Sequence, residues 1–256
     1  MTRPAILQAV VDQVYAAFEH LPRPVQLDAS PAHDAAEITA LTSAPLNELT
    51  DDAIGAYADS AIWTIGGGRD YAYFLPRILE LAVSNPVWLG AEPAVIAKKL
   101  HLAEWKKWRD SQQEAVVRVF ETAFHSALEL PADSGLMAGD WLCGLAALGF
   151  DVEPYLAAWE QKSSPEAAFQ LAHFLNVAID DDGSVSGCWW EEQTEAARGA
   201  VGRWLLKEER EAALVEAAGR FGPYRDWDLE LALVNRERAM SARNTARRGD
   251  GAAGED

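Results

Sequence analysis

Residues that favour helices far outnumber residues that favour strands in this chain, and this imbalance limits the fold more than any other feature. Among its 256 residues are 46 Ala and 27 Leu, whereas Val, Ile and Thr together number 32. Ala and Leu are strong helix formers, while β-branched residues favour strands. The composition therefore predicts a mainly α-helical protein and argues against a β-sandwich or a parallel sheet.

Apolar residues also recur at helical spacing along most of the chain, as in the stretch from Pro4 to His20. Thr50, followed by Asp51 and Asp52, predicts a helix that runs to Ile62 or Trp63, because hydroxyl caps and anions favour the positive end of a helix. Such segments follow one another with short turns between them and no strict repeat. Most tryptophans of the later segments are expected to anchor the core: Trp141, Trp159, Trp190, Trp204 and Trp227.

This series of helices predicts an all-α fold, in which stacked antiparallel helices form an irregular, solenoid-like array. We expect a single all-α domain over residues 1–242. The last residues, 243–256, turn to Ala, Gly, Arg and Asp and predict a disordered C-terminal tail.

The charge balance excludes several classes of partner. The chain has 22 Lys and Arg against 40 Asp and Glu, a net charge of -18. Such a protein repels phosphate backbones and anionic lipid surfaces, so we expect neither a nucleic-acid nor a membrane partner. The residues from Glu129 to Glu195 include 13 acidic side chains against one basic side chain, Lys162. This acidic half is either a solvated surface or a docking surface for a basic partner.

The cysteines and the N-terminus indicate a cytoplasmic protein. Cys143 and Cys188 are too few for a disulfide framework, and their separation is not a metal-ligand spacing. The first apolar stretch is interrupted by Gln8 and Asp12, unlike a signal peptide. We therefore expect cysteine thiols in a reducing compartment.

The catalytic and ligand-binding motifs that the sequence suggests are all incomplete. His101 and Glu104 lack the second histidine of a metal-protease helix. The acidic turn from Asp180 to Gly183 lacks the first and last carboxylates of a calcium loop. The glycines from Gly66 to Gly68 match neither a P-loop nor a dinucleotide fingerprint. The sequence thus predicts no catalytic set, no metal and no cofactor.

One segment nevertheless concentrates specialised residue types around Pro76, and its candidate structural or functional residues are Trp63, Asp70, Tyr73, Arg77 and Glu80. In a structural interpretation, a kinked helix lies in the core and Arg77 is at least half buried, paired with Glu80 or, less favoured, Asp70. In a functional interpretation, Arg77 binds an anion in an aromatic-lined notch.

The same segment resembles a group of uncharacterised bacterial proteins. These proteins carry a Trp-Gly turn followed by the segment Phe-Leu-Pro-Arg-Ile-Leu-Glu-Leu, which here runs from Phe74 to Leu81. Later similar landmarks are Trp105-x-x-Trp108, Cys143-Gly144, Leu156-Ala-Ala-Trp159 and Trp204-Leu205. The resemblance implies an all-α fold and a bacterial source, and it implies no activity.

The sequence is compatible with two functions. The first is a protein–protein interaction module, immunity-like or scaffold-like, that docks a basic partner through an acidic surface. The alternative is an enzyme or a small-ligand-binding protein with a pocket near Arg77.

Overall fold

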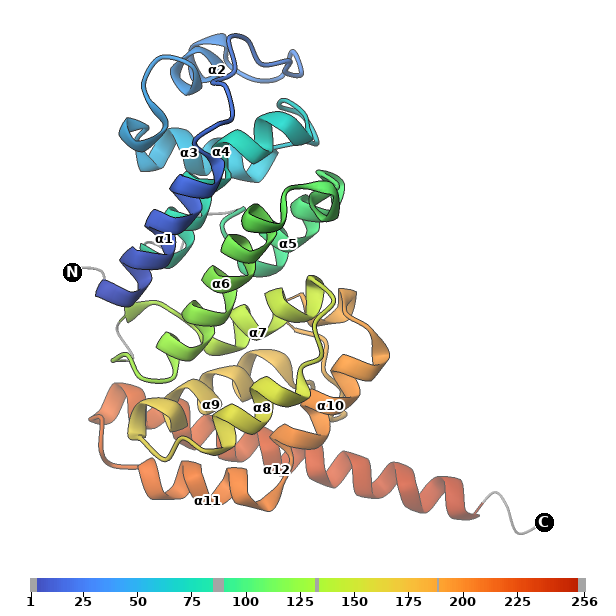
Figure 1. Ribbon diagram of the computed structural model, residues 1–256. Helices are drawn as coiled ribbons and strands as arrows, with labels where there is room; N and C mark the ends of the chain where they lie inside the picture. The colour runs from blue at the N-terminus through green and yellow to red at the C-terminus, as the bar shows by residue number, and fades with distance from the viewer. Residues whose placement is uncertain (1–3, 85–89, 132–133, 188, 253–256) are drawn as a thin grey trace. The chain divides into compact units, whose positions relative to one another are not determined.

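The computed structural model describes residues 4–84, 90–131, 134–187 and 189–252, and this part of the chain is built of α-helices joined by turns (Figure 1). In the described residues, pairing between extended segments is limited to isolated bridges such as that of Ala29 with Ile65. The predicted all-α class is confirmed. The chain groups into two compact units, Met1–Ser126 and Ala127–Asp256. The expectation of one domain over residues 1–242 stays a prediction.

The first unit is arranged around a central helix, α4 (Gly68–Ser84). Helices α1 (Ala5–Phe18), α3 (Asp51–Ser60) and α5 (Pro93–Leu102) pack against α4, and the short α2 (Ala35–Leu41) packs on α3. Helix α6 (Asp110–Ala127) is the last helix of the unit along the chain. Short 3₁₀ helices, η1 (Leu46–Glu48) and η2 (Trp105–Lys107), precede α3 and α6.

Helix α4 is buried on most of its circumference, as expected for a core helix. Its buried residues are Tyr71, Ala72, Phe74, Leu75, Pro76, Ile78, Leu79, Leu81, Ala82 and Val83. Pro76 lies inside this continuous helix. The predicted position of this helix in the core is therefore confirmed, while the predicted kink at Pro76 stays a prediction.

The second unit is arranged around α9 (Pro165–Ala178), which packs against α7 (Ala138–Ala147), α11 (Glu208–Ala217) and α12 (Pro223–Ala252). Helices α8 (Glu153–Glu160) and α10 (Glu195–Leu205) pack on one another. A Cβ on Gly139 of α7 would lie 2.5 Å from the Phe174 ring of α9, so this close approach requires a glycine.

Aromatic residues fill the core of the second unit, as the sequence predicts. Trp159 stacks on Phe174 with ring centroids 5.8 Å apart, and Trp190 lies 5.8 Å from the same phenylalanine. Trp141 and Trp204 are also buried. Trp227 on α12 is the exception among these five, since 59% of its surface is exposed.

The last helix extends into the segment for which the composition predicts a disordered tail, and the disorder of that tail stays a prediction. Helix α12 continues to Ala252, whereas the composition predicts disorder from Arg243. Arg243 Nε and Nη2 donate hydrogen bonds to the carbonyl oxygen of Gly183, at 3.1 and 2.6 Å. These bonds anchor the helix beyond the point where its composition turns polar. Residues 253–256 lie outside the described part of the chain.

Candidate functional site

The structure divides the five candidate residues around Pro76 among separate places in the first unit. Arg77 and Glu80 form an ion pair on α4, with 2.7 Å between Nη1 and Oε2. Asp70 lies in the first turn of α4. Its Oδ2 accepts a hydrogen bond from the backbone N–H of Gly67, just before the helix, at 2.8 Å. Asp70 therefore caps the start of α4, and the pairing of Arg77 with Glu80 is confirmed.

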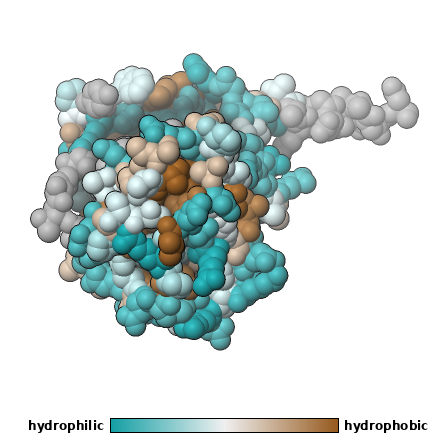
Figure 2. Space-filling model, turned by 90° about the horizontal axis from the view of Figure 1, so that it is seen from above, coloured by the Kyte–Doolittle hydropathy of each residue, from teal (hydrophilic) through white to brown (hydrophobic). Residues whose placement is uncertain are grey.

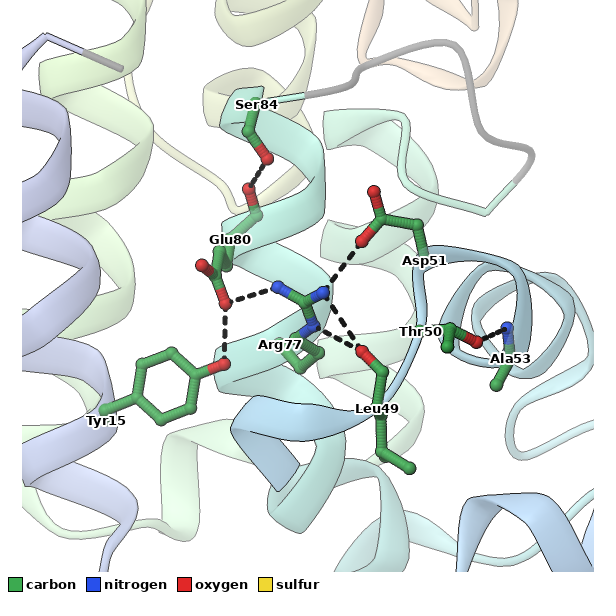
Figure 3. Close-up of polar contacts among 8 residues, drawn as sticks. All are labelled: Tyr15, Leu49, Thr50, Asp51, Ala53, Arg77, Glu80 and Ser84. Atoms are coloured by element: carbon green, nitrogen blue, oxygen red, sulfur yellow. Dashed lines mark hydrogen bonds and ion pairs between the residues drawn. The ribbon is translucent and has the colours of Figure 1, made fainter. Parts of the chain in front are cut away.

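Arg77 joins three segments of the first unit (Figure 3). Its Nε and Nη2 donate to the carbonyl oxygen of Leu49 at 3.2 and 3.0 Å, and Nη2 also donates to Asp51 Oδ1 at 2.7 Å. On the other side, the Tyr15 hydroxyl of α1 donates to Glu80 Oε2 at 2.7 Å. One guanidinium thus ties α4 to the start of α3, and through Glu80 to α1.

This arrangement leaves Arg77 little capacity for an added anion. A guanidinium has five N–H donors, and the contacts with Leu49, Asp51 and Glu80 use four of them. Burial opposes the charge of Arg77, but the hydrogen bond and charge of Glu80 raise the pKa of the guanidinium above its ordinary value. The Arg77 side chain is only 15% exposed. Its burial and its contacts both favour the structural interpretation, in which Arg77 is a buried, paired residue.

Tyr73 and Trp63 have different surroundings. Tyr73 packs edge-on against Phe74 with ring centroids 5.0 Å apart, and burial raises the pKa of its hydroxyl. Trp63 is 53% exposed, and its ring lies 4.5 Å from the Nζ atom of Lys99. Lys99 is fully buried, and no local pattern of residues singles it out.

Lys99 of α5 terminates helix α3. Its Nζ donates to the carbonyl oxygens of Ala58 and Asp59, the latter at 2.6 Å. These carbonyls lie at the negative end of α3, where a cation is stabilised. The sequence predicts that this helix runs to Ile62 or Trp63, but α3 ends at Ser60. The contact with Lys99 explains the earlier end, because it occupies carbonyl oxygens that a longer helix would use. Burial lowers the pKa of Lys99 to about 8, although the charges of Asp59 and Glu92 act in the opposite direction.

The lowered pKa gives a prediction about stability at alkaline pH. From about pH 8 to the usual lysine value of 10.5, the unfolded chain binds more protons at this site than the folded chain. The free energy of unfolding therefore receives a contribution from Lys99 that increases as the pH rises through this window. We expect the stability of the wild type relative to Lys99→Met to increase between pH 7.5 and pH 9.5, measured by urea unfolding. The exposed neighbour Lys98 provides the control, Lys98→Met, for which no such trend is expected; a flat difference for Lys99→Met would contradict the assignment.

A groove of about 730 Å³ lies between α2 and α3 in the same unit. The residues that line it are His33, Glu37, Ile38, Ala40, Leu41, Thr50, Asp52, Ala53, Gly55, Ala56, Tyr57, Asp59, Ser60 and Ile65. Tyr57 is fully buried and packs on Phe74 of α4 with 4.4 Å between ring centroids, which fixes that part of the lining to the central helix. Figure 2 shows one face of the molecule, on which apolar side chains lie at the surface among hydrophilic ones.

Three exposed carboxylates, those of Glu37, Asp52 and Asp59, line this groove. Within the described residues, no Lys or Arg side chain forms an ion pair with any of them. The groove belongs to a stretch, residues 25–68, that has seven acidic residues and no Lys or Arg. This run of acidic residues could have identified the groove from the sequence. The segment from Glu129 to Glu195 has more acidic residues and was therefore the one singled out.

That acidic half is partly neutralised by later helices of the second unit. Lys207 Nζ lies 2.8 Å from Glu160 Oε1, and Arg210 Nη2 lies 3.1 Å from the same oxygen. Glu153 faces Arg203 at 3.7 Å. The acidic half is therefore less negative in the fold than its sequence suggests.

The remaining candidate features of the sequence are metal-binding side chains, the two cysteines and membrane-spanning helices. Within the described residues, no group of three or more His, Cys, Asp or Glu side chains could hold a metal ion. Cys143 is buried on α7, while Cys188 lies outside the described residues. Among the helices that are described, none is long and apolar enough to cross a membrane.

Comparison of the chain with protein-family models, with curated proteins and with solved structures found no match. The resemblance to the bacterial group that shares the Phe74–Leu81 segment therefore stays a prediction.

Proposed function

We propose that this protein is an interaction module, immunity-like or scaffold-like, that binds a basic segment of a protein partner in the groove between α2 and α3. One observation carries the proposal: the groove combines exposed carboxylates with apolar lining residues in a stretch of chain that has no Lys or Arg. A basic, amphipathic segment complements both properties, because its cations would face the carboxylates and its apolar side chains would leave water.

The apolar part of the groove supports a protein partner over a small anion or a nucleic acid. Ile38 and Leu41 of α2 and Ala53 and Ala56 of α3 all line it. Burial of apolar surface contributes roughly 25 cal/mol per Å² and is not directional, so it suits a partner with several aliphatic side chains. The negative charge of the whole chain, -18, adds long-range attraction for a cationic partner.

Two synthetic peptides test this function. One is an amphipathic helix-forming peptide with leucines on one face and arginines on the other, and the second has glutamates in place of the arginines. We expect the basic peptide to bind and the acidic peptide not to bind, as measured by fluorescence anisotropy. Binding of the basic peptide should weaken as salt is added, since the attraction between exposed charges is screened.

Substitutions in the groove locate the binding. The exposed Ala56 is replaced by arginine, which fills the groove and reverses its charge; we expect the affinity for the basic peptide to fall at least about tenfold. The triple variant Glu37→Gln, Asp52→Asn, Asp59→Asn should also weaken binding about tenfold. A matched control removes three exposed acidic charges from the second unit: Asp181→Asn, Glu191→Gln and Glu195→Gln. Equal losses in the two triple variants, or full binding by Ala56→Arg, would refute the groove as the site.

A further inference from the structure

The turn between α3 and α4 holds an exposed tryptophan in a strained backbone. Ile62 has a φ of +69°, in the left-handed region that β-branched residues avoid. Trp63 follows it and is 53% exposed. Strain of this kind persists only where surrounding contacts impose it, and it concentrates at functional sites.

Hydrogen bonds on both sides hold this turn in place. Within the turn, the Ile62 N–H donates to the Ile65 carbonyl oxygen at 3.0 Å, and the Thr64 N–H donates to that of Ser60 at 3.0 Å. From the preceding loop, the Ser30 N–H donates to the Thr64 carbonyl oxygen at 2.9 Å. The Trp63 side chain is therefore presented by a backbone that is fixed before any partner arrives.

The turn also forms one end of the acidic groove. Ser60 and Ile65, which flank the turn, line the groove, and so does Asp59. His33 lines it as well, and its Nε2 lies 2.8 Å from the Thr64 hydroxyl. Trp63 itself is not among the lining residues, but it lies between Ser60 and Ile65 in the chain and therefore next to this end of the groove.

The chemistry of the two ring faces differs. One face of Trp63 lies over the buried Lys99 ammonium, whose Nζ is 4.5 Å from the ring centroid. The exposed part of the ring is available to a partner, and so is the exposed carboxylate of Asp59, whose charge acts on the same Lys99 ammonium. An arginine side chain suits this pair of groups best, because its planar guanidinium stacks on aromatic rings and also bonds carboxylates with two donors, whereas the ammonium of lysine is a compact point charge.

We propose that Trp63 is the aromatic anchor of the acidic groove and that it selects partner segments by arginine, whose guanidinium stacks on the exposed ring. This inference rests on the proposed function of the groove. Exposed tryptophans are among the residues that contribute most to binding at protein interfaces. The partner is therefore an arginine-rich amphipathic segment, and lysine at the same positions is the weaker ligand.

The test compares two peptides that differ only in having arginine or lysine at every basic position. Both are titrated against the full chain and against Trp63→Ala, with affinity measured by fluorescence anisotropy. We expect the arginine peptide to bind the wild type about fivefold more tightly than the lysine peptide. In Trp63→Ala the arginine peptide should lose about tenfold in affinity, and the preference for arginine should vanish.

Trp227→Ala is the matched control, since Trp227 is also an exposed tryptophan, at 59%, but lies in the second unit. It should leave both affinities unchanged. Trp63→Phe keeps an aromatic face and should retain part of the preference for arginine, which separates loss of the ring from loss of the fold.

The outcomes distinguish this inference from the proposed function. If Ala56→Arg abolishes binding while Trp63→Ala behaves like Trp227→Ala, the groove is the site and the anchor role of Trp63 is wrong. If the two peptides bind the wild type equally, selection by arginine is wrong. If Ala56→Arg binds as the wild type does, the proposed function itself fails and the inference fails with it.

Discussion

Replacement of Arg77 by alanine is expected to lower the free energy of unfolding by about 3–5 kcal/mol, because it removes one partner from a largely buried ion pair. The Arg77 side chain is 15% exposed and that of Glu80 is 20% exposed. Without the guanidinium, the Glu80 carboxylate loses its cation and the Leu49 carbonyl oxygen loses the donors that the structure shows. The contacts that join the start of α3 to α4 are lost together.

Thermal unfolding and hydrogen exchange would measure this effect. A loss of this size should lower the melting temperature by about 10 °C. Hydrogen exchange should increase most in α1, α3 and α4, the helices that the Arg77 network joins. Arg69→Ala, an exposed arginine on the same helix, is the control and should have little effect. If Arg77→Ala melts within about a degree of the wild type, Arg77 is not structural and its role as a ligand-binding group returns.

Replacement of Arg236 by alanine should have the second largest effect, about 2–4 kcal/mol, because buried carbonyls left without a donor cost about 1–3 kcal/mol each. Arg236 lies on α12 and is 5% exposed. Its Nη2 donates to the carbonyl oxygens of Leu206 and Lys207 at 3.2 and 3.1 Å, and its Nη1 pairs with Glu211. This one side chain therefore connects the end of α10, the start of α11 and the middle of α12.

Urea unfolding combined with hydrogen exchange tests the Arg236 prediction. Exchange should increase in α10, α11 and α12, while the protection of α3 and α4 should stay unchanged. The neighbouring Arg238 is exposed on the same helix, so Arg238→Ala controls for the loss of positive charge. Equal stabilities of Arg236→Ala and Arg238→Ala would show that the carbonyl contacts contribute nothing.

Arg77, Lys99, Arg236 and Arg243 share a feature that sequence patterns do not show. Each is a cation on one helix that donates hydrogen bonds to backbone carbonyl oxygens of another segment. Lys99 and Arg236 act at helix C-termini, where unsatisfied carbonyls concentrate negative charge. Because these partners are separated by 28 to 60 residues, no local pattern identifies them.

Features within a few residues were the ones that the sequence predicted. The Ala and Leu content predicted the α-helical class, and Thr50 begins α3 through a hydrogen bond from the Ala53 N–H at 3.2 Å. The spacing of Arg77 and Glu80 predicted their ion pair, since residues three apart lie on the same side of a helix. These features depend on local propensity and helical geometry, which the sequence contains directly.

Only the tertiary structure decided which faces of the helices meet and which stay exposed. It paired Arg77 with Asp51, buried Lys99 beneath an exposed Trp63, left Trp227 at the surface, and placed α2 against α3 so that a groove with acidic residues remained. An apolar or charged residue has the same local pattern whether it is covered or exposed. Its burial depends on packing between segments that are distant in the chain, because the apolar area removed from water is a property of the assembled helices and not of any one of them.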